Sequence, residues 1–400
     1  MGLVAALGMM NSLGVYHGYL TEHQLGDYSE STVSWIFSMY IFLSFFCGLQ
    51  IGTVFDAHGL RLLVLAASIF ICLSMFLLGI CVQYWHFFIV FAIGGLGTSL
   101  IFTPALAAVS HFFFEKRGNT TGIAAAGGSL GSVTCPLALQ QLFPRFGFAW
   151  ATRAVGFVYV ACCIIACLLI KSRLPPKQQS VLPDFRVLRN NSYALLIAAI
   201  FLMEWALFVP ITYLASFAYS SRAMTHAFSY QLIAVFNAGS CVGRWVPGLP
   251  ADRLGRFNCM IGALAVCGVT SLAFWLPAAT LVPGADDMPA TASTALTIKA
   301  LSIVYAVVFG FALGSNISLT PVCVRQLCDT SQYGRYYATC YTIVSFSTLT
   351  GVPITSNVLG KTPGCRYWGV VIWTTACYIA ASFLFMWSRA QHVGWKLRKF

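Results

Sequence analysis

Charged residues are scarce in this 400-residue sequence. Only 8% of the residues are Asp, Glu, Lys or Arg, and 58% are hydrophobic, whereas soluble globular chains carry about 25% charged residues. A soluble domain could not bury so many apolar side chains, but a bilayer accepts about 20 apolar residues in each spanning helix. The composition excludes a soluble protein and predicts an all-α, multi-pass membrane protein.

Signatures of metal and nucleotide chemistry are also missing. No Cys-x-x-Cys pair occurs among the 15 cysteines, and several of them lie inside apolar runs, where a thiol behaves as a small hydrophobic group. The seven histidines are scattered, and no Gly-x4-Gly-Lys-Ser/Thr phosphate loop is present. We therefore expect no catalytic residue, no metal and no cofactor, and neither a membrane-embedded enzyme nor an ATP-driven pump.

Apolar runs separated by polar breaks predict twelve spanning helices. Each run is far longer than the 9–11 residues that a transmembrane β-strand needs. The first run lacks a basic flank and is followed by further spans, so we interpret it as a span and not as a cleavable signal peptide. The predicted spans are 2–20, 33–54, 61–82, 86–112, 119–142, 149–171, 193–218, 228–248, 257–277, 297–320, 335–358 and 367–388.

The basic residues give the predicted spans an orientation. If the N-terminus is cytosolic, 16 of the 23 Lys and Arg residues fall on cytosolic segments and six on the opposite side. Cytosolic loops carry an excess of Lys and Arg, so both termini are predicted to be cytosolic. The net charge of +12 is then a signal of topology and not of nucleic-acid binding.

Two short charged runs recur at half the chain length. The first is IGTVFDAHGLR (51–61) and the second is PGLPADRLGR (247–256); both place Gly, Asp and Gly at the same spacing, with Arg close behind. A second pair, GTSLIFTP (97–104) and GSNISLTP (314–321), shares the pattern Gly-x5-Thr-Pro. The two members of this second pair lie further apart along the chain than the two charged runs do, and an insertion at 278–296 explains the difference. The repeat predicts two related halves.

A polar, proline-containing and basic stretch divides these halves. We predict two pseudo-symmetric six-helix bundles, at 1–171 and 193–390, joined by a cytosolic linker at 172–192 and followed by a cytosolic tail at 391–400. Parallel repeats with a substrate site near the interface between halves are typical of transporters.

The two charged runs fall on predicted cytosolic turns. The first glycine of each run permits close approach of helices, and the second permits a tight reversal. The aspartate lies near the N-terminus of the next helix, whose dipole favours a negative charge, and an arginine can reach that aspartate or a neighbouring helix end. We predict gating loops made of Gly52, Asp56, Gly59, Arg61, Gly248, Asp252, Arg253, Gly255 and Arg256.

These runs resemble the signature loop of the major facilitator superfamily. Three further stretches are similar to its monocarboxylate-transporter-like branch, the last two most of all to fungal members: HFFFEKRGNTTGIAAAGGSLG (111–131), FPRFGFAWATRAVGF (143–157) and GRWVPGLPADRLGRFN (243–258). The resemblance covers nearly the whole chain. It implies secondary transport by alternating access, in which the two halves rock around a central site.

Two ionisable residues are the main candidates within predicted spans, where such residues are costly and mark function. Glu204 lies near the middle of the seventh span, and a carboxyl at that depth is a candidate proton carrier or a structural hydrogen-bonding group. Arg244 lies near the cytosolic end of the eighth span and offers a planar fork suited to a carboxylate; an inner-gate or snorkelling role is the alternative. The resemblance implies that an Arg at this place takes part in binding the substrate anion and in proton coupling.

Further polar residues are candidates to line a cavity or to hold helices together. They are Asn11, Asn237, Tyr16 and His17. The sequence departs from animal members of the resembled branch at Ser240, where they carry an acid, and it lacks their Lys in the first span. These departures do not favour simple proton–lactate symport.

The expected function is secondary active transport of a small organic solute, an organic anion or monocarboxylate-like compound, with proton coupling. The alternative is export of a larger secondary metabolite. The fifth span, TGIAAAGGSLGSVTCP, lacks the Gly-Pro motif of antiporters, which favours symport. A small-molecule substrate, protons and the bilayer are the expected partners of a monomer that binds no nucleic acid. We expect the plasma membrane, with a vacuolar or other endomembrane as the alternative.

Overall fold

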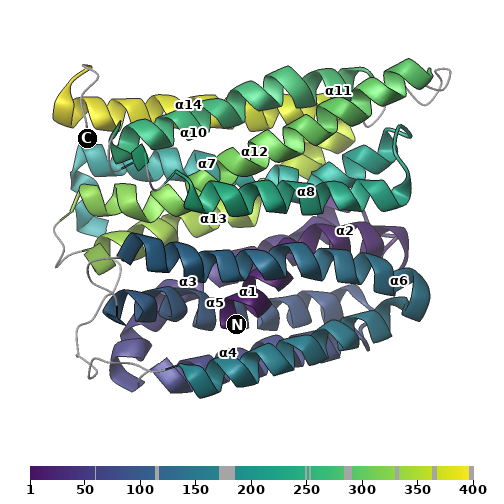
Figure 1. Ribbon diagram of the computed structural model, residues 1–400, viewed down its shortest axis with the longest axis horizontal. Coiled ribbons are helices and arrows are strands. Elements are labelled where there is room, and N and C mark those ends of the chain that lie inside the picture. The colour runs from purple at the N-terminus through teal and green to yellow at the C-terminus, as the bar shows by residue number, and fades with distance from the viewer. Residues whose placement is uncertain are drawn as a thin grey trace. The chain divides into compact units, whose positions relative to one another are not determined.

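A computed structural model describes residues 1–58, 60–112, 117–170, 185–247, 250–251, 254–282, 291–328, 333–362 and 367–395. Within these ranges the regular structure is helical, and no strand is present (Figure 1). The elements are α1 (Gly2–Asn11), α2 (Leu13–Glu22), α3 (Glu30–His58), α4 (Leu60–Leu78), α5 (Tyr84–Phe112), α6 (Arg117–Leu169), η1 (Phe185–Arg189), α7 (Asn191–Ser220), α8 (His226–Trp245), α10 (Arg256–Thr270), η2 (Ser271–Trp275), α11 (Leu276–Thr280), α12 (Ala292–Gln326), α13 (Tyr333–Lys361) and α14 (Trp368–Val393).

Helix α6 contains two of the predicted spans. Its 53 residues would extend about 80 Å as one straight helix, more than twice the roughly 30 Å of a bilayer's apolar core. Gly147 interrupts it with φ 72°, a left-handed conformation that costs other residues about 1–2 kcal/mol. The predicted spans 119–142 and 149–171 therefore meet at Gly147.

The number of crossings agrees with the sequence. Within the described ranges, nine helices are long and apolar enough to span a membrane. The turn at Gly147 divides α6, one of these nine, into two crossings. Helices α1 and α2, separated only by Ser12, together form one more crossing, and α8 supplies the twelfth. The predicted fold class of twelve helices is confirmed.

The chain divides into two compact units, Met1–Pro183 and Asp184–Phe400. Most of the predicted linker lies outside the described residues. Where description resumes, η1 is followed by Asn190, whose side chain accepts hydrogen bonds from the backbone N–H groups of Ser192 and Tyr193. This cap starts α7 at Asn191, two residues before the predicted span.

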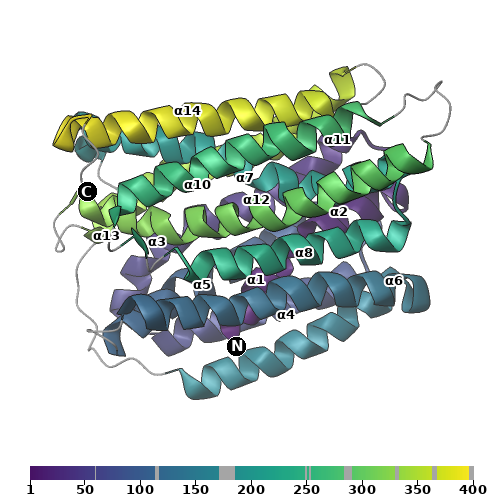
Figure 2. The same ribbon diagram turned by 45° about the horizontal axis from the view of Figure 1, so that its top comes forward.

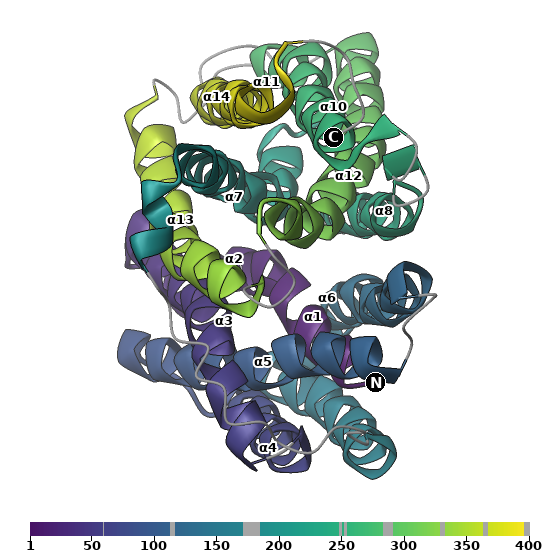
Figure 3. The same ribbon diagram turned by 90° about the vertical axis from the view of Figure 1, so that its left-hand side faces the viewer.

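The long helices of each unit run side by side (Figure 2). In the N-terminal unit, α5 contacts α3 and α4, while α6 contacts α1 and α4. In the C-terminal unit, α12 contacts α8 and α10, and α14 contacts α7 and α10. Figure 3 views these helices nearly end-on.

Glycines bring the backbones of α8 and α12 together. Gly239 and Gly243 on α8 face Gly310 and Gly314 on α12, and each pair has the Gly-x3-Gly spacing. A Cβ atom on Gly239 would lie 2.6 Å from the carbonyl oxygen of Val307, and one on Gly243 would overlap the carbonyl oxygen of Phe311. Small residues at this spacing allow close packing of membrane helices.

We predict that Gly243→Ala destabilises the C-terminal unit. Because the added methyl group would meet the α12 backbone, the helices must separate, and overpacking of this kind costs about 1–3 kcal/mol. The measurement is the melting temperature of the purified protein in detergent. Gly262→Ala on α10 is the matched control, since no described atom lies within 4 Å of its Cβ position; it should leave the melting temperature unchanged or raise it. Equal melting temperatures for both variants would contradict the packing argument.

Candidate functional site

Glu204 lies in the interior of the C-terminal unit. It is 13 residues beyond the start of α7 at Asn191, a distance of about 20 Å along the helix, and its side chain is only 4% exposed. The carboxyl lies within electrostatic reach of Cys340 and Tyr341 on α13 and of Tyr378 on α14. Glu204 is therefore a membrane-embedded carboxyl surrounded by neutral polar groups.

The surroundings of Glu204 limit what it can do chemically. Burial is the main influence on its carboxyl, and within the described part of the chain no basic group acts on it. A buried charge without a partner is strongly unfavourable, so a carboxyl in this place is suited to holding a proton and to releasing it only when its surroundings change.

Arg244 belongs to a polar face of α8. It lies half-buried in the last turn of the helix. Asn237 and Ser240 precede it by seven and four residues, so the three share one side of the helix; both are almost completely buried. Arg244 is not among the groups that act on the Glu204 carboxyl.

Tyr16 lies in an aromatic core of the N-terminal unit. Its ring meets those of Phe91, Phe143 and Phe148 edge-on, with centroids 5.6, 6.0 and 6.1 Å away. Its hydroxyl lies 3.9 Å from the sulfur of Met75. These contacts are typical of helix packing.

His17 is also completely buried in this unit. Its Nε2 atom lies 3.3 Å from the Ser34 hydroxyl, and its ring meets Phe37 edge-on with centroids 5.4 Å apart. The histidine thus links α2 to α3.

Part of the first predicted gating loop is helical. Helix α3 continues to His58, so Asp56 lies in its last turn and not in a loop that begins after residue 54; Gly52 lies within the same helix, and Gly59 lies outside the described residues. Hydropathy marks the depth of the bilayer core, whereas a helix ends where its backbone hydrogen bonds end. Arg61 is exposed in the first turn of α4.

Part of the second predicted loop is described. Gly255 precedes α10 with φ 97°, a conformation that favours glycine, and Arg256 begins the helix. Gly248, Asp252 and Arg253 lie outside the described residues.

The neighbours of Glu204 were not predicted from the sequence. Tyr341 and Tyr378 lie 137 and 174 positions further along the chain, and sequence spacing gives no indication that they meet α7. The one signal in the sequence that could have indicated such neighbours is a tyrosine within an apolar span, because a buried tyrosine hydroxyl usually finds a polar partner.

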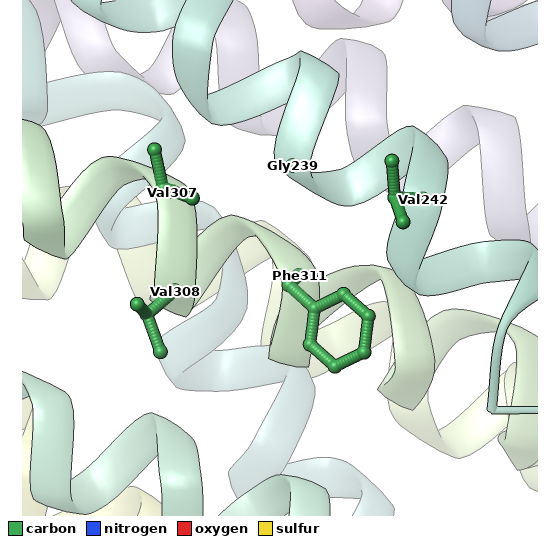
Figure 4. Close-up of a pocket in the computed structure, with 5 residues that line it drawn as sticks. All are labelled: Gly239, Val242, Val307, Val308 and Phe311. Carbon is green, nitrogen blue, oxygen red and sulfur yellow. The ribbon is translucent and has the colours of Figure 1, made fainter.

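An apolar groove lies along α8 and α12 (Figure 4). Its volume is about 280 Å³, and Gly239, Val242, Val307, Val308 and Phe311 line it. None of these side chains offers a polar group, so the groove lacks the chemistry to recognise a charged solute.

The family follows from comparison with known proteins. The model of the Major Facilitator Superfamily matches residues 1–298. The chain belongs to this superfamily. As a member, it is a multi-pass membrane transporter and not an enzyme.

Three similar proteins illustrate the superfamily's range. The riboflavin transporter of Saccharomyces cerevisiae is 30% identical over 425 aligned residues, covering 100% of this chain and 78% of the relative. The aspyridones efflux protein of Emericella nidulans is 33% identical, covering 90% and 70%. The fujikurins efflux protein of Gibberella fujikuroi is 31% identical, covering 88% and 72%.

A solved structure shares the fold of this superfamily member. The nucleoside transporter NupG superposes with a TM-score of 0.72 over 97% of this chain and 98% of its own, at 13% identity. The similarity extends over nearly the whole of both chains, and it concerns the fold alone.

We predict that Glu204→Gln folds normally and that Glu204→Lys does not. The glutamine side chain is neutral and similar in size, whereas a lysine would bring a cation among neutral groups with no carboxylate to balance it, at a cost of several kcal/mol. The measurement is the melting temperature together with elution as a single species in detergent. Glu30→Lys, at the half-buried start of α3, is the control and should be tolerated. Normal folding of Glu204→Lys would show that water or an anion reaches this position.

Proposed function

We propose that the chain is a proton-coupled transporter of a small organic anion that works by alternating access. The observation that carries this proposal is the burial of Glu204 among neutral groups: it is a carboxyl deep in α7, 4% exposed, and no basic group among the described residues acts on it. Intramembrane ionisable residues are rare and mark proton relays and solute pathways. Glu204 is the proposed proton carrier.

Arg244 is the proposed partner of the substrate anion. Its guanidinium stays protonated and can bind a carboxylate through two parallel hydrogen bonds. Asn237 and Ser240 on the same face of α8 add hydrogen-bonding groups beside it. Because Arg244 does not act on Glu204, proton binding and anion binding would use separate groups.

The remaining predicted residues have supporting roles in this proposal. The repeated glycine–aspartate–arginine runs would hold the cytosolic side closed in one state and release it in the other. The contacts of Tyr16 and His17 within the N-terminal unit support a role in packing. Uptake of a small organic solute is supported by similarity to the riboflavin transporter of yeast. We place the protein in the plasma membrane, where a proton gradient can drive uptake.

Export of a larger secondary metabolite is the second candidate function. Two of the similar proteins carry names that describe efflux, of aspyridones and of fujikurins. Under this reading, Glu204 would exchange a proton for substrate, and the direction of transport would reverse.

We predict that uptake of a radiolabelled anion into transporter-depleted yeast is greater at pH 5 than at pH 7.5. The anions to test are monocarboxylates and dicarboxylates, and riboflavin is tested beside them as a neutral compound. Glu204→Gln should lose the stimulation at low pH because it cannot exchange a proton, and Arg244→Ala should lose uptake of the anion at both pH values. Glu30→Gln and Arg153→Gln are the controls, since Glu30 lies at a helix start and Arg153 lies over the ring of Trp150.

Surface expression of each variant is measured in parallel. Absence of uptake for every tested compound, despite normal expression, would reject the symport proposal and favour efflux. Release of a preloaded metabolite by cells that carry the intact protein, but not by cells that lack it, would then support metabolite export.

A further inference from the structure

Four completely buried side chains of the C-terminal unit carry a polar atom that makes no hydrogen bond of good geometry within the described residues. The atoms belong to three helical segments, η2, α12 and α14. They are Trp275 Nε1, Tyr305 OH, Asn316 Oδ1 and Tyr378 OH. Together with Cys267 on α10, these residues are called here the buried polar cluster.

Ring contacts connect three members of the cluster. The rings of Trp275 and Tyr305 have centroids 5.0 Å apart, and Tyr305 lies 4.9 Å from Phe309. Phe309 in turn meets Tyr378 with centroids 5.6 Å apart. The polar atoms therefore belong to one contiguous region.

Cys267 lies at the centre of this region. Its sulfur accepts a hydrogen bond from Asn316 Nδ2 at 3.4 Å, and the thiol lies within electrostatic reach of Tyr305 and Tyr378. Tyr378 is also within reach of Glu204. Through Tyr378, the cluster adjoins the carboxyl on α7.

The backbone beside the cluster is irregular. Residues Ser271–Trp275 form the π-helical turn η2 between α10 and α11. Such turns are rare and frequently mark functional sites, and they rearrange the hydrogen bonds of the backbone. Trp275 belongs both to this turn and to the cluster. The Ser271 hydroxyl, also in the turn, donates to the Cys267 carbonyl oxygen at 2.8 Å.

Energetics do not favour a dry cluster. Each buried polar atom without a partner costs about 1–3 kcal/mol. Trp275 Nε1 and Asn316 Oδ1 have no partner within the described residues, and the hydroxyls of Tyr305 and Tyr378 approach Ser271 and Cys267 without forming hydrogen bonds of good geometry. Buried water molecules make about three hydrogen bonds each to polar groups of this kind. Hydration of the cluster would remove most of the cost.

We propose that internal water molecules occupy the buried polar cluster and conduct protons to Glu204. The second part rests on the proposed role of Glu204 as the proton carrier. Each water molecule or the Tyr378 hydroxyl would accept one proton and pass another to its neighbour, so that one proton is added to the Glu204 carboxylate and no group is oxidised or reduced. The titratable groups that face Glu204 are Cys340, Tyr341 and Tyr378, and in the described ranges no charged group acts on its carboxyl.

Radiolytic labelling tests the hydration directly. X-rays applied to the purified protein in detergent generate hydroxyl radicals from water, including bound internal water, and mass spectrometry measures oxidation of each side chain. Tyr305 and Tyr378 should be oxidised several-fold faster than two equally buried tyrosines. These controls are Tyr40, whose hydroxyl lies 2.6 Å from the Thr98 hydroxyl, and Tyr213, whose hydroxyl donates to the Val352 carbonyl oxygen at 3.4 Å. Equal rates for all four would overturn the proposal.

Two variants separate this inference from the proposed function. Tyr378→Phe should slow uptake driven by a proton gradient several-fold and should slow exchange of labelled for unlabelled substrate less, because exchange needs no net proton movement. Tyr213→Phe should alter neither. If Glu204→Gln retains proton-driven uptake, the proposed role of Glu204 fails, whereas fast labelling of Tyr305 and Tyr378 would still support hydration. Unchanged gradient-driven uptake in Tyr378→Phe would overturn the conduction of protons.

Discussion

The apolar interior of a bilayer offers no hydrogen-bond partner to the backbone, and the rest of this structure depends on that constraint. Every crossing has to satisfy its N–H and C=O groups within its own helix, so packing between helices falls to side chains and to close backbone contacts. The paired glycines of α8 and α12 bring two such backbones together. Gly147 performs the opposite task, because it ends one crossing and allows the next to begin.

The same constraint makes polar side chains in the interior informative. Most buried Ser and Thr side chains here donate to a carbonyl oxygen three or four residues earlier in their own helix, as Thr212, Ser302 and Thr355 do. Such bonds satisfy the hydroxyl locally and need no neighbour. Glu204 and the buried polar cluster cannot be satisfied in this way, which is why they are candidates for transport chemistry rather than for packing.

Different parts of the candidate site could be predicted to different degrees. The depth of Glu204 followed from its position within an apolar run, because the rise of a helix converts residue number into distance. The assignment of Tyr16 to a cavity or to a helix contact could not be made from the sequence, and the structure places its ring among Phe91, Phe143 and Phe148. The end of α3 was misplaced by four residues, because polarity changes at the membrane surface while helical hydrogen bonding continues to His58.

The sequence by itself determined the number and order of the crossings, the turn near Gly147 and the repeat of two halves. These properties are local, since hydropathy, turn residues and short motifs act within one segment of the chain. Only the tertiary structure decided what surrounds Glu204 and that Cys267, Tyr305, Asn316 and Tyr378 share one region. Those contacts join helices far apart in sequence, and the side chains that meet there are selected by the packing of helix against helix, which no single segment specifies.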